Sequence, residues 1–148
     1  MLVPQTVFPD DVYLVSYPKS GNTWMRFHLA ALVFDRRCDW NSLNAVIPDA
    51  YSTPDEKLVH APRPRIIKSH QGYDDRYPKV IYLVRDVRDV VVSYYYHQKG
   101  RGHFPQHHGF NTFFDWFVSD AVWPGGWDHH VVGWLNNRAR IPNGFLLV

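Results

Sequence analysis

Short apolar segments that alternate with helical patterns constrain the fold of this chain more than any other feature. Residues 11–17 (DVYLVSY) form a continuous apolar run, and residues 23–35 then carry apolar side chains three and four positions apart. Two further short runs follow at residues 65–70 (RIIKSH) and 79–85 (KVIYLVR). Strands that are apolar on both faces are typical of parallel sheets covered by helices. We therefore predict an α/β fold, an open parallel sheet with helices on both faces.

Turn and capping residues divide the segments that connect these strands. Residues 36–64 contain four prolines, which predicts a long irregular connection with room for one short helix. Asp86 is a good N-cap, so a helix is expected from there to about Gln98. A Gly- and His-rich loop at 99–109 should follow. Two more helices are expected, at about 111–121 and 126–138.

The last five residues, 144–148 (GFLLV), resemble the start of a fourth parallel strand. A parallel strand needs neighbours and a covering helix. We therefore expect residues 1–148 to be the N-terminal portion of one longer domain, with its C-terminal part missing from the sequence.

Composition excludes several classes of function. The 16 Lys and Arg against 14 Asp and Glu give a net charge of +2, too little to indicate a nucleic-acid surface. No run approaches the roughly 20 apolar residues of a membrane span, and no signal peptide begins the chain. Cys38 is the only cysteine, which is compatible with a reducing compartment. These features favour a cytoplasmic protein that binds neither membrane nor nucleic acid.

The turn after the first strand has the composition of an anion site. Residues 17–24 (YPKSGNTW) combine a lysine, two hydroxyl side chains and a glycine directly before a helix. Helix N-termini present free N–H groups and a positive dipole end to anions. The turn is not a Walker A loop, because Lys19 precedes Gly21 and no earlier glycine exists. The alternative is an ordinary turn in which Ser20 or Asn22 caps the helix.

Two other strand ends carry residues of catalytic or phosphate-binding types. Lys68 and His70 are two positions apart, so both should face one side of the sheet. A histidine there could act as a general base. Arg85 ends the third strand and Ser93 lies two turns into the next helix, a pairing that suits a phosphate. Carboxyl ends of parallel strands meet at one sheet edge, so one site is expected.

The motifs 17–24, 64–70 (PRIIKSH) and 80–95 (VIYLVRDVRDVVVSYY) resemble, in this order, those of the soluble cytosolic-type sulfotransferases. Members of that family use 3′-phosphoadenosine 5′-phosphosulfate (PAPS) as sulfuryl donor and release 3′-phosphoadenosine 5′-phosphate (PAP). The resemblance implies a P-loop NTPase-like fold. It also implies transfer of a sulfuryl group to a hydroxyl or amine of a small-molecule acceptor.

Roles for individual residues follow from the resemblance. His70 would deprotonate the acceptor, while Lys19 and Lys68 would stabilise charge on the 5′-phosphate and the sulfuryl group. Trp24 would lie against the adenine. Donor binding would use Lys19, Ser20, Gly21, Asn22, Thr23 and Trp24, with Arg85 and Ser93 on the 3′-phosphate. No metal is expected, because neither an acidic cluster nor the histidines near residue 105 complete a metal-ligand spacing.

Two alternatives remain open at this stage. A P-loop nucleotide kinase would require the Walker A loop that is absent here. A catalytically inactive nucleotide-binding fragment would bind the donor without turnover. The aromatic content of 16% favours a flat or apolar acceptor such as a phenol or sterol.

Overall fold

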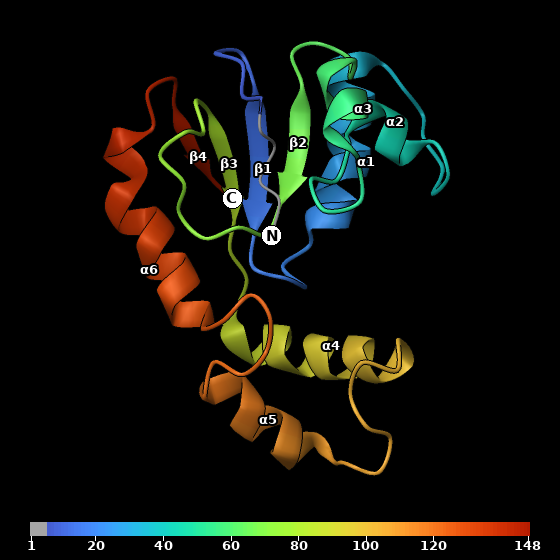
Figure 1. Ribbon diagram of the computed structural model, residues 1–148, viewed down its shortest axis with the longest axis vertical. Helices are drawn as coiled ribbons and strands as arrows, with labels where there is room; N and C mark the ends of the chain where they lie inside the picture. Colours follow the sequence, from blue (N-terminus) through green and yellow to red (C-terminus); the bar gives the residue numbers. More distant parts are fainter. Residues whose placement is uncertain (1–5) are drawn as a thin grey trace.

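Four strands form one parallel sheet in a computed structural model of the protein, which describes residues 6–148 (Figure 1). The strand order is β2-β1-β3-β4, and every neighbouring pair is parallel. The strands are β1 (Val12–Ser16), β2 (Ile66–Ser69), β3 (Val80–Leu83) and β4 (Phe145–Leu147). Their order places β1 and β3 side by side, although β2 comes between them in the sequence. The chain reverses its direction of travel across the sheet at this point, where open α/β sheets bind ligands.

Alternate residues of β1 pack into two separate cores. Val12 and Leu14 contact the layer that contains α1 (Asn22–Phe34) and α2 (Leu43–Val46). Tyr13 and Val15 contact the opposite layer, which contains α3 (Asp55–Val59) and α6 (Trp127–Asn137). All five residues of β1 are buried. The prediction of an open parallel sheet with helices on both faces is therefore confirmed.

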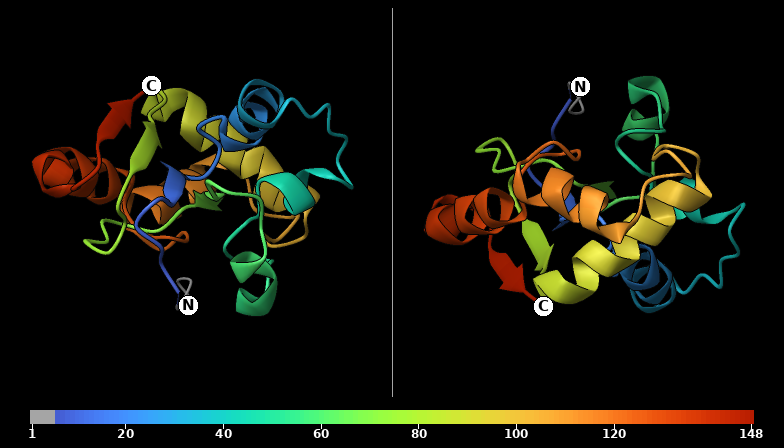
Figure 2. Two further views of the ribbon diagram at one scale, coloured as in Figure 1. Left: turned by 90° about the horizontal axis from the view of Figure 1, so that it is seen from above. Right: turned by 90° about the horizontal axis from the view of Figure 1, so that it is seen from below.

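A helical hairpin lies beyond the carboxyl ends of the strands. It consists of α4 (Val87–Gly100) and α5 (Phe110–Val118), and the pair lies beneath the sheet in Figure 1 and in front of it in the right-hand view of Figure 2, which is seen from below. Asp86 caps α4 as expected, because its carboxylate accepts from the backbone N–H of Arg88 at 2.9 Å. Tyr17, at the end of the first strand segment, packs into the core of this hairpin. The hairpin thus lies opposite the carboxyl ends of β1 and β3.

The connection at 36–64 differs from its prediction. It contains two short helices, α2 and α3, where one was expected. Each buries one leucine, Leu43 on one face of the sheet and Leu58 on the other. Helices this short show no helical period in the sequence, and the four prolines around them predict irregular backbone. A 3₁₀ turn, η1 (Arg138–Arg140), also follows α6.

A buried ion pair joins the starts of β1 and β2. Arg65 donates from Nε to Asp11 Oδ1 at 2.7 Å, and its Nη2 reaches the second carboxylate oxygen. Both side chains are fully buried. The same guanidinium also donates to the carbonyl oxygens of Leu58 and Thr6. Within residues 6–148, no helix is both long and apolar enough for a bilayer crossing.

Candidate active site

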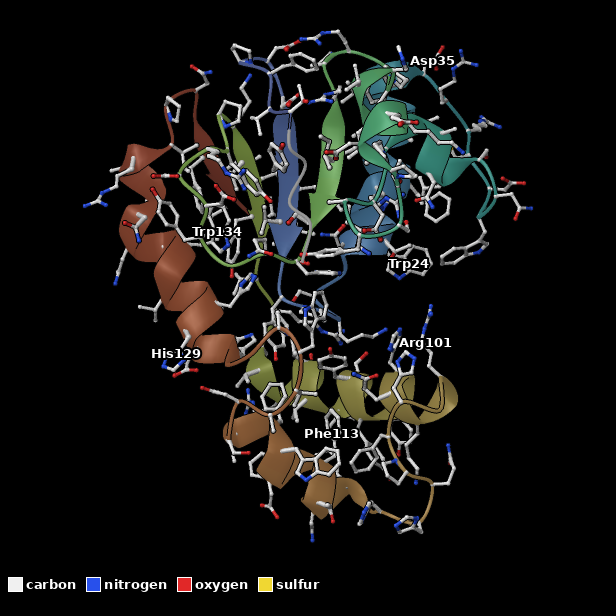
Figure 3. The ribbon with its side chains drawn as sticks, in the orientation of Figure 1. Trp24, Asp35, Arg101, Phe113, His129 and Trp134 are labelled. Atoms are coloured by element: carbon white, nitrogen blue, oxygen red, sulfur yellow. The ribbon has the colours of Figure 1, made fainter. Side chains whose placement is uncertain are left out.

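A cleft of about 790 Å³ lies between the carboxyl ends of β1–β3 and the hairpin helix α4. Trp24, at the start of α1, and Arg101, after the end of α4, lie on its opposite walls (Figure 3). Nearly all of the predicted site residues line this one cleft: Lys19, Gly21, Asn22, Thr23, Trp24, Lys68, His70, Arg85 and Ser93. Ser20 does not line it. Its hydroxyl is buried in the turn and has no partner among the described residues.

The turn between β1 and α1 leaves the first N–H groups of the helix without a side-chain cap. Gly21 is the N-cap residue at φ 95°, and Lys19 also has a positive φ of 71°. Neither Ser20 nor Asn22 caps the helix, so that alternative reading is wrong. The Asn22 amide instead donates to the Leu14 carbonyl and the Ser16 hydroxyl, both at 3.1 Å. Asn22 thereby fixes the helix start against β1, and the uncapped N–H groups suit an anion.

Cations dominate the electrostatics of the cleft. Burial lowers the pKa of Lys19, and the nearby charges of Arg101, Arg85 and Lys68 lower it further. Asp49 is the one carboxylate among the lining residues, and it accepts from Lys68 Nζ at 2.6 Å. The remaining cations are not neutralised within the cleft. An anionic ligand would satisfy them.

His70 is held as a neutral imidazole with a defined tautomer. Its Nδ1 lies 2.7 Å from the Ser16 carbonyl oxygen, which can only accept, so Nδ1 carries the proton. The backbone N–H of His70 donates to the Tyr51 hydroxyl at 3.0 Å. Burial, aided by the charge of Lys68, lowers the pKa of His70 to about 3. Its Nε2 lone pair is therefore available as a base at neutral pH.

His130 supports His70 from α6. Its Nε2 lies 3.2 Å from the His70 carbonyl oxygen and must donate to it. Its Nδ1 then accepts from the Tyr82 hydroxyl at 2.9 Å. Burial lowers the pKa of His130 to about 4, so this tautomer persists at neutral pH. Nothing in the sequence distinguishes the buried His130 from its exposed neighbour His129.

Arg85 and Ser93 reach the cleft from β3 and α4. Arg85 Nη1 donates to the Lys19 carbonyl at 3.1 Å, so the end of β3 contacts the turn that follows β1. Its other contact is a 3.5 Å ion pair with the exposed Asp89. Ser93 lies on the α4 wall of the same cleft. The guanidinium is thus close to the turn and only weakly held by Asp89 of α4.

Several lining residues were not identified from the sequence. Aromatic rings surround His70: Tyr51 stacks at a centroid distance of 6.2 Å, and Trp123 meets it edge-on at 5.9 Å. Both come from irregular segments that show no period. The C-terminal end of α4 adds three more polar residues: His97, Gln98 and Arg101. His103, from the His-rich loop expected at 99–109, also lines the cleft.

One group of possible metal ligands exists among residues 6–148: Asp120, Asp128 and His129. All three are exposed, and none lines the cleft.

Comparison with known proteins gives consistent relatives. The sulfotransferase domain model matches residues 9–148. Mouse sulfotransferase 1A1 is 34% identical over 154 residues, covering 93% of this chain and 53% of that protein. Human sulfotransferase 2B1 is 29% identical, covering 97% and 42% respectively. The chain therefore spans about half the length of the curated relatives it matches.

Solved structures agree on the fold. Mouse sulfotransferase SULT7A1, complexed with PAP, aligns with a TM-score of 0.69 at 27% identity, over 96% of this chain and 52% of that chain. Retinol dehydratase in complex with androsterone and PAP aligns at 0.73 and 22% identity, over 97% and 55%. Because the family model spans nearly all of the sequence, the chain belongs to the sulfotransferase domain family.

Proposed function

We propose that the protein transfers a sulfuryl group from PAPS to a hydroxyl or amine of a small-molecule acceptor. The observation that carries this proposal is the arrangement of one cleft. A neutral histidine with a free Nε2 faces the same space as an uncapped helix N-terminus and several unneutralised cations. The PAP found in the structure of mouse SULT7A1 supports the same donor here.

The residues present fit the donor. The turn at 17–24 offers backbone N–H groups, and the Lys19 and Thr23 side chains of this turn line the cleft on the side proposed for the 5′-phosphate. Arg85 and Ser93 would hold the 3′-phosphate. Trp24, which is 75% exposed at the cleft edge, leaves its ring free to cover the adenine.

The chemistry is an in-line substitution at sulfur. The acceptor oxygen bonds to sulfur while the bond from sulfur to the bridging oxygen breaks. The acceptor proton moves to His70 Nε2, and the electron pair of the broken bond stays on the 5′-phosphate of PAP. Lys19 balances the charge that develops there, and Lys68 that on the sulfuryl oxygens. Positioning and charge neutralisation should dominate, as in phosphoryl transfer.

A second candidate is a nucleotide-binding chain without turnover. The two candidates differ in turnover with a range of acceptors and not in PAP binding. We also propose a cytoplasmic location, with which a single cysteine is compatible.

Calorimetric titration with PAP, 5′-AMP and ADP tests the donor site. We expect PAP to bind more tightly than AMP, and Arg85→Ala to lower PAP affinity by roughly 10- to 100-fold, since it removes a charge-assisted contact. Arg140→Ala, on the exposed turn η1, is the matched control and should change nothing. Equal binding of PAP and AMP would contradict the donor assignment.

A further inference from the structure

One face of α4 carries a row of polar residues that continues past the donor site. Ser93, His97 and Arg101 are spaced four residues apart, so they lie along one helix face, and all three line the cleft. Arg101 lies about 12 Å further along the axis than Ser93, at 1.5 Å per residue. The end of this row is therefore distinct from the residues assigned to the 3′-phosphate.

Hydrogen-bond donors at this end lack acceptors. Arg101 donates from Nε to His97 Nε2 at 3.2 Å, which leaves the proton of that imidazole on Nδ1. His97 Nδ1 is buried and has no partner among residues 6–148. Within the same residues, the Nη groups of Arg101 have no acceptor either. Nearby, His103 and Gln98 contact each other at 3.2 Å.

The positive charge at the Arg101 end of the row also lacks a negative partner. Burial lowers the pKa of His97 to about 4, and the charges of Lys19 and Arg101 act in the same direction. No carboxylate lines this end, because Asp49 is already paired with Lys68. Cations that repel one another in a half-enclosed cleft indicate a missing anion.

A continuous series of side-chain contacts along the cleft wall connects Arg101 to His70. The Trp123 ring meets the His70 ring edge-on, and the Trp123 carbonyl accepts from the Tyr94 hydroxyl. The Tyr94 ring lies 6.3 Å from the His97 ring, and His97 contacts Arg101. An acceptor whose hydroxyl meets His70 would lie along the aromatic part of this wall and reach its cationic end.

We propose that His97 and Arg101 form a subsite for an anionic group, and that the acceptors are hydroxyl compounds bearing a carboxylate, such as acidic phenols. This inference rests on the proposed sulfotransferase function. It refines the flat, apolar acceptor expected from composition: the aromatic wall would hold the ring and Arg101 the carboxylate.

The test compares 3-(4-hydroxyphenyl)propionate with its methyl ester, which lacks the negative charge and carries one more methyl group. Binding to the whole chain is measured by calorimetry, with and without saturating PAP. We expect the carboxylate to bind about tenfold more tightly than the ester, the size of a charge-assisted hydrogen bond in a partly solvated site. Arg101→Gln should remove that ratio, and the exposed Arg140→Gln should leave it in place.

Three results would overturn the subsite. Equal affinity for acid and ester would show that no anion is recognised. If Arg101→Gln still prefers the acid to the ester, the carboxylate is recognised by other cations, such as Lys19. Loss of PAP affinity in Arg101→Gln, with the acid-to-ester ratio unchanged, would assign Arg101 to the donor. If PAP itself does not bind, the sulfotransferase proposal fails, and the ratio measured without PAP still decides on the subsite.

Discussion

At the scale of single residues, the state of His70 depends on its surroundings more than on its own chemistry. The Ser16 carbonyl sets the tautomer of the His70 ring. The Tyr51 hydroxyl accepts from the backbone N–H of His70, and His130 Nε2 donates to the His70 carbonyl oxygen. Each neighbour comes from a different part of the chain. An imidazole held in this way needs no charged partner, and burial keeps it neutral.

His70→Gln tests the general-base role. The amide preserves size and polarity but cannot take up a proton, so we expect turnover of a good acceptor to fall by about 10²- to 10⁴-fold. PAP affinity, measured by calorimetry, should change little. A variant that retains most of its rate, or loses rate and PAP affinity together, would contradict a role confined to proton transfer.

At the scale of elements, the ion pair between Asp11 and Arg65 joins the starts of β1 and β2. Asp11→Ala would leave a fully buried guanidinium without its counter-charge, and we expect a loss of about 3–5 kcal/mol in the free energy of unfolding. Asp10→Ala is a closely matched control, because its partner Arg63 is about half exposed; that loss should stay below about 1 kcal/mol. Urea denaturation measures both. Equal losses would contradict the effect of burial.

Helices and strands are predicted well where apolar residues recur at a regular spacing, and poorly where no such spacing exists. The strands and α1 follow from apolar runs and helical spacing, and Asp86 marks the start of α4. The motifs at three strand ends locate most of the cleft, because parallel strands bring their ends together. The connection at 36–64 supplies Asp49 and Tyr51 through irregular backbone that has no period to read. Arg101 lies eight residues, or two steps of four, beyond Ser93, a spacing that could have been found had the predicted helix been extended past Gln98.

At the scale of the whole molecule, stability should depend on pH through the buried histidines. The folded pKa values of His70 and His130, about 3 and 4, lie below the ordinary value of 6.5. Below pH 6.5 the unfolded chain therefore binds protons that the folded chain does not. Stability is complete above that pH and falls as the pH drops.

Between pH 7 and pH 5 we expect the unfolding free energy to fall by about 2 kcal/mol for each of these two histidines. Denaturation curves at a series of pH values measure this slope. His130→Phe should reduce the slope by roughly a third to a half, because His97, with a folded pKa also lowered to about 4, adds to it. His129→Phe, an exposed neighbour, should not alter the slope. A slope that is the same in all three proteins would contradict a neutral, buried His130.

The row of Ser93, His97 and Arg101 also has an evolutionary consequence. These three residues lie on one helix face, so inserting or deleting one residue of α4 would turn those beyond it by about 100°. Substitutions change one contact and preserve the others. Descendants of this gene should therefore acquire new acceptors through point replacements along the row, while the length of α4 stays constant.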